Sequence, residues 1–68
     1  MILTKQMAVE LWQQFVAIGE QEEFRRIVNF YGVDKMFQLE AEKRAECFLY
    51  LADLLAGVKQ IMRERENG

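Results

Sequence analysis

The apolar residues between Cys47 and Met62 recur at intervals of three and four positions, and the chain contains no proline. This spacing places them on one side of an α-helix, because side chains three and four positions apart share a helical face. Runs of alternating β-branched residues, which indicate strands, are no longer than a few positions anywhere in the sequence. The sequence therefore predicts an all-α fold dominated by one long C-terminal helix.

Capping and stop residues predict two shorter helices before the long one. Thr4 is a suitable N-cap for a first helix, and Gly19 is its expected left-handed stop. A second helix is expected from about Glu20 to Tyr31, ending at Gly32. We therefore expect one three-helix domain over residues 1–68, a helical bundle with two short helices and a long third one.

The third helix is predicted to start at Asp34 as its N-cap and to reach Arg65, a length of about 45 Å at about 1.5 Å per residue. Its apolar arc spans about 200°, whereas docking on one core needs about 100°. The excess predicts contact with another subunit. The expected interface residues are Cys47, Tyr50, Leu51, Leu54, Leu55, Val58, Ile61 and Met62.

Size and composition agree with self-association. The chain has 68 residues, of which 51% are hydrophobic. A domain of about 60 residues buries only about 60% of the surface that its unfolded chain exposes. We therefore expect a homo-oligomer, with a homodimer as the first choice, and an unidentified protein partner as a further possibility.

Several function classes are disfavoured by what the sequence contains. It has no His and no Ser, one Thr and one Cys, so a Ser/His or Cys/His nucleophile pair cannot form within one chain, and zinc lacks ligands. The net charge of −2 gives no reason to expect nucleic acid binding, and the acidic start of the third helix argues against a helix-turn-helix. No apolar run is long enough for a membrane span. The lone Cys and the absence of a recognisable signal peptide predict a cytoplasmic protein.

Carboxylates form the one pattern that suits a metal ion. Glu42 and Glu46 lie four residues apart, on one face of the predicted helix, with Asp53 near the same line. Such a pair can hold Mg²⁺ or Mn²⁺ if a second helix supplies further oxygen ligands. The alternative is that these carboxylates bind no metal and form a polar helix face that is exposed to solvent or lies between subunits.

Residues 27–49 resemble the first helical half of the small phage-type MazG-like nucleoside triphosphate pyrophosphohydrolases. The resemblance rests on the Tyr31–Gly32 step and on a Glu-Glu-x-x-Glu motif that falls on Glu42, Lys43 and Glu46. It implies an all-α dimer or tetramer that uses Mg²⁺ to hydrolyse a nucleoside triphosphate to the monophosphate and pyrophosphate. Lys43 stands where the family has its second glutamate, and the family's later Glu-x-x-Asp motif has no counterpart here.

These observations favour a small non-catalytic helical interaction module of phage or mobile-element type, self-associating through its third helix. No cofactor is expected for this function. The alternative is a degenerate or split MazG-like enzyme whose subunits share a site, with Glu42 and Glu46 as Mg²⁺ or Mn²⁺ ligands.

Overall fold

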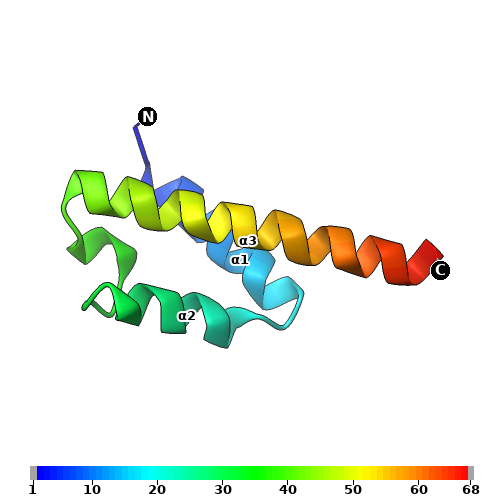
Figure 1. Ribbon diagram of the computed structural model, residues 1–68. Coiled ribbons are helices and arrows are strands. Elements are labelled where there is room, and N and C mark those ends of the chain that lie inside the picture. Colours follow the sequence, from blue (N-terminus) through cyan, green and yellow to red (C-terminus); the bar gives the residue numbers. More distant parts are fainter. Residues whose placement is uncertain (1, 68) are drawn as a thin grey trace.

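The computed structural model describes residues 2–67, and the side chains of residues 2–66. Over this range the chain forms three α-helices and a short 3-10 helix, without a strand. They are α1 (Lys5–Ala17), α2 (Gln21–Phe30), η1 (Met36–Gln38) and α3 (Ala41–Asn67). In Figure 1, α1 and α2 pack against the N-terminal part of α3, and the C-terminal end of α3 projects beyond both. The predicted all-α architecture with three helices is confirmed.

The ends of α1 and α2 follow the local chemistry of single residues. The hydroxyl oxygen of Thr4 accepts a hydrogen bond from the backbone N–H of Met7 at 3.2 Å, as an N-cap does. Gly19 and Gly32 have φ angles of 75° and 88°, a region that only glycine adopts readily. These three residues therefore fix the helix limits close to where the sequence predicts them.

The predicted start of the third helix at Asp34 is wrong, because α3 begins at Ala41. The side-chain oxygen of Gln38 accepts hydrogen bonds from the backbone N–H groups of Asp34 and Lys35, at 2.9 and 3.2 Å. These side-chain bonds stabilise a turn around η1 in place of helix. The segment between α2 and α3 is consequently a folded loop.

The loop also brings Met36 into the core. A continuous helix would separate Met36 from Leu51 by about 22 Å along its axis, whereas both residues belong to one buried cluster. Arg44 holds the loop against the first turn of α3. Its guanidinium donates to the carbonyl oxygens of Leu39 at 2.9 Å and Phe37 at 3.4 Å, and lies 4.5 Å from the centre of the Phe37 ring.

One hydrophobic core joins all the elements. The Phe24 ring meets the rings of Phe15 and Trp12 edge to face, with centroids 5.3 and 5.1 Å apart. Among the described residues no polar or charged side chain is buried. The buried residues are Leu11, Phe15, Phe24, Ile27, Val28, Met36, Cys47, Leu51 and Leu55.

Candidate interaction surface

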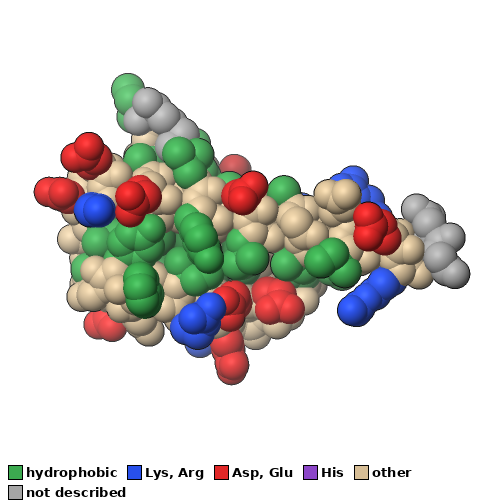
Figure 2. All heavy atoms as spheres, in the orientation of Figure 1, with side chains coloured by type: hydrophobic (Ala, Val, Ile, Leu, Met, Phe, Trp, Pro, Cys, Tyr) green, Lys and Arg blue, Asp and Glu red, His purple; other side chains and the backbone are tan. Residues whose placement is uncertain are grey.

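Large apolar side chains remain accessible on one end of α2 and along α3. Phe30 is 86% exposed, Tyr50 57%, Ile61 53% and Met62 41%. Figure 2 shows hydrophobic side chains gathered across the neighbouring parts of α2 and α3, with charged groups around them. We call this set the α2–α3 surface. It comprises Phe30, Tyr50, Leu54, Val58, Ile61 and Met62, of which Leu54 and Val58 are half-buried.

Aromatic rings form the α2 end of this surface. Phe30, Tyr31 and Tyr50 line a hollow of about 240 Å³ together with Arg26 and Ile27. The Phe30 and Tyr31 rings meet edge to face, with centroids 6.5 Å apart. Burial, followed by the nearby Glu46 carboxylate, raises the pKa of Tyr31.

Arg26 is fixed beside this hollow by Glu23, one helical turn earlier. The guanidinium Nε donates to Glu23 Oε2 at 3.1 Å, and a second guanidinium nitrogen pairs with the other carboxylate oxygen. This hydrogen-bonded pair lowers the pKa of Glu23. Tyr and Arg are among the residue types enriched at the energetic centres of protein interfaces.

The core-facing line of α3 continues past the body of the molecule. Cys47, Leu51 and Leu55 on this line are buried, Val58 is half-buried, and Met62 is exposed. The apolar residues of α3 therefore keep their helical spacing beyond the point where α1 and α2 cover the helix.

The side chains of residues 59–66 are all exposed, and we call this segment the α3 arm. At its base, Lys59 Nζ donates a hydrogen bond to Gln14 Oε1 on α1 at 2.7 Å. This bond marks where α3 leaves the body of the molecule.

The structure divides the predicted interface residues into two groups. Cys47, Leu51 and Leu55 lie inside the single chain, because α1 and α2 cover that flank of α3. Helical spacing identifies an apolar face but does not say whether the same chain or another copy covers it. The remaining five lie on the α2–α3 surface: Tyr50, Leu54, Val58, Ile61 and Met62.

Phe30 is a member of this surface that sequence reasoning missed. Its position is about 120° around α2 from Phe24, at about 100° per residue, so it falls outside the face formed by Phe24 and Val28. The sequence could have indicated this exposure, because Phe30 is a large aromatic residue that lies outside the buried face of a short helix.

The predicted metal ligands occupy the exposed beginning of α3. Glu42 and Glu46 are both exposed, and Lys43 Nζ lies 3.7 Å from Glu46 Oε2, forming an ion pair. No group of three or more Cys, Asp or Glu residues close enough to share a metal ion occurs within residues 2–66. Within the described part of the chain, the other helices therefore bring no further carboxylate close enough to share an ion with this pair.

Cys47 is fully buried. Burial, followed by the charge of Glu46, raises the pKa of its thiol to about 11. A thiol in this state is a poor nucleophile at neutral pH, because the thiolate is the reactive form. Cys47 is thus a core residue, with the chemistry of a small apolar side chain.

Comparison of the chain with family models, curated proteins and solved structures gives no match. The three helices of the described region include none that is both long and apolar enough to cross a membrane.

Proposed function

We propose that this chain is a small non-catalytic helical module that acts by binding protein, and that it self-associates through α3. The observation that carries the proposal is the continuation of the apolar face of α3 beyond the body. Ile61 is 53% exposed and Met62 41%, and both lie beyond Lys59, where α3 projects past α1 and α2 (Figure 1). Apolar side chains gain free energy when they leave water, at about 25 cal/mol per Å².

The spacing of the accessible residues suits contact with another helix. Leu54, Val58 and Ile61 are separated by four and three positions, the spacing of knobs-into-holes packing. The molecule is 42 Å long and only 16 Å across its shortest dimension, and α3 spans nearly all of that length. Two α3 helices side by side could therefore bury a continuous strip.

The chemistry of the surface supports contact over catalysis. Its members are aromatic and aliphatic, and Arg26, which lines the hollow at its α2 end, is paired with Glu23. The phage-type setting of such a module rests on the resemblance of residues 27–49 to MazG-like helices.

Sedimentation velocity with Ile61→Glu tests the proposal. We expect the parent chain to sediment as a dimer at micromolar concentration and the variant as a monomer, because the new carboxylate would have to be buried without a partner. Far-ultraviolet circular dichroism should report unchanged helix content, since Ile61 is 53% exposed and does not belong to the core. Gln60→Glu is the matched control. It adds the same charge at the adjacent exposed position, away from the Leu54–Val58–Ile61 line, and should leave the dimer intact.

A parent chain that sediments as a monomer throughout the micromolar range would contradict self-association. A dimer that survives Ile61→Glu would show that the contact lies elsewhere.

A further inference from the structure

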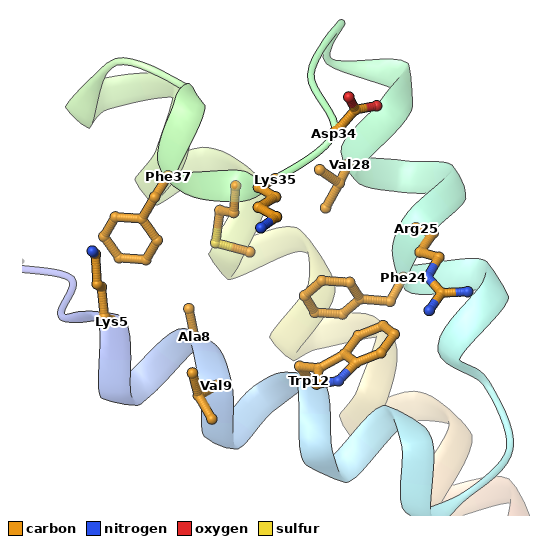
Figure 3. Close-up of a pocket in the computed structure, with 11 residues that line it drawn as sticks. Lys5, Ala8, Val9, Trp12, Phe24, Arg25, Val28, Asp34, Lys35 and Phe37 are labelled. Carbon is orange, nitrogen blue, oxygen red and sulfur yellow. The ribbon is translucent and has the colours of Figure 1, made fainter.

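A second apolar depression lies on another side of the molecule, between α1, α2 and the loop that contains η1. Its volume is about 630 Å³, and no residue of α3 lines it. The floor is apolar, formed by Trp12 of α1 and by Phe24 and Val28 of α2 (Figure 3). Met36 of η1 also lines it. We call it the α1–α2 groove. It shares no residue with the α2–α3 surface.

Positive charge surrounds this apolar floor. Lys5 lies at the start of α1, Arg25 in the middle of α2, and Lys35 immediately before η1; the groove has one carboxylate, that of Asp34. The formal charge of the rim is thus +2, in a chain whose net charge is −2. Within residues 2–66 the ion pairs are Arg26–Glu23 and Lys43–Glu46, so none of the three rim cations lies within ion-pair distance of a described carboxylate.

The cations are spread around the floor. In Figure 3, Lys5 lies beside Phe37 at one end, Arg25 lies beside Trp12 at the other, and Lys35 lies between these ends. The Arg25 guanidinium carbon is 5.1 Å from the centre of the Trp12 ring, so positive charge borders the largest apolar group of the floor directly.

From this arrangement we propose that the α1–α2 groove binds an acidic segment of a partner protein. An apolar side chain of that segment occupies the floor, and its carboxylates face Lys5, Arg25 and Lys35. Separated cations favour a ligand that carries several separated negative charges. An amphiphile with one head group, such as a fatty acid, would meet only one end of the rim. Charge complementarity of this kind sets both the specificity and the rate of association.

Trp12 supplies a local reporter, because it is the single tryptophan of the chain and lines the groove. The probe is a ten-residue peptide of alternating glutamate and leucine pairs. Control peptides replace every glutamate by lysine, or every leucine by alanine. We expect the acidic peptide to shift Trp12 emission to shorter wavelength in a saturable manner and to bind more weakly as salt rises. Both control peptides should bind at least about threefold more weakly.

Charge reversal on the rim provides the second arm of the test. Lys35→Glu should weaken peptide binding by about three- to tenfold, measured by anisotropy of the labelled peptide. Arg63→Glu on the α3 arm makes the same charge change away from the groove and should leave the dissociation constant unchanged.

Three binding results would overturn the proposal, and sedimentation supplies a fourth. One is equal binding of the lysine and glutamate peptides. Another is equal weakening by Lys35→Glu and Arg63→Glu, which would indicate general electrostatics. The third is saturation of the Trp12 response by dodecanoate with no response to the acidic peptide, which would assign the groove to a lipid.

Sedimentation of the Lys35→Glu variant separates this proposal from self-association. A change in mass would indicate that a second copy of the chain fills the groove.

Discussion

Replacing Leu51 by alanine should remove most of the stability of the fold. Leu51 is fully enclosed by the core, whereas Leu49, two residues earlier on the same helix, is 55% exposed. A buried Leu→Ala change costs about 2.7–5 kcal/mol, because the transfer free energy is lost and a cavity remains. A core in a chain of this size rarely supplies more than about 3–5 kcal/mol. Leu49→Ala should change the free energy of unfolding by about 0.5 kcal/mol or less.

Urea unfolding followed by circular dichroism measures the difference. With a slope of about 1 kcal/mol per M, the midpoint of Leu51→Ala should fall by about 3 M, or the cooperative transition should disappear. Leu49→Ala should unfold close to the parent midpoint. Equal losses in the two variants would refute the assignment of Leu51 to the core. So would a Leu51→Ala variant that keeps its helix content but halves in mass, since that result would place Leu51 between subunits.

Three further predictions concern glycine positions, pH and metal ions. Gly32→Ala should lower the free energy of unfolding by about 1 kcal/mol because its φ is 88°. Gly57→Ala should raise it by about 0.5–1 kcal/mol, since Gly57 lies in mid-helix and an added methyl group would have no atom within 4 Å beyond the adjacent residues and the backbone of its own helix. Paired urea titrations compare the two variants. Stability should decline from about pH 9 to about pH 11, because the folded chain keeps the Cys47 proton that the unfolded chain releases. Thermal unfolding across this range should show a smaller decline for Cys47→Ala. Millimolar Mn²⁺ should leave the melting temperature unchanged, because only binding to the folded state raises it. A rise that Glu46→Gln removes, together with pyrophosphate release from nucleoside triphosphates, would favour the enzymatic alternative.

Features determined by neighbouring residues could be predicted from the sequence. The Thr4 cap depends on one hydroxyl and a backbone N–H three positions later. Gly19 and Gly32 stop their helices because glycine alone adopts positive φ without strain. The start of α3 could not be predicted in the same way. Asp34 is a good capping residue in isolation, but Gln38 binds the local N–H groups, and the core gains Met36 only when the chain turns there.

The candidate surfaces depend on contacts between distant parts of the chain. The pattern of α3 shows that Cys47, Leu51 and Leu55 face apolar surroundings, but not that α1 and α2 provide them. The α1–α2 groove depends on residues of three elements, and nothing in the spacing of Lys5, Arg25 and Lys35 along the sequence indicates that they surround one floor.

Because α3 projects beyond the body, the part packed in the core and the α3 arm should differ in the free energy of local opening. Amides near Leu51 should exchange hydrogen only when the core opens, whereas those beyond Lys59 should exchange when the helix end frays. Trypsin acting under native conditions would therefore cut after Arg63 and Arg65 first and leave the three-helix body folded. A binding partner on the arm would slow both exchange and cleavage there.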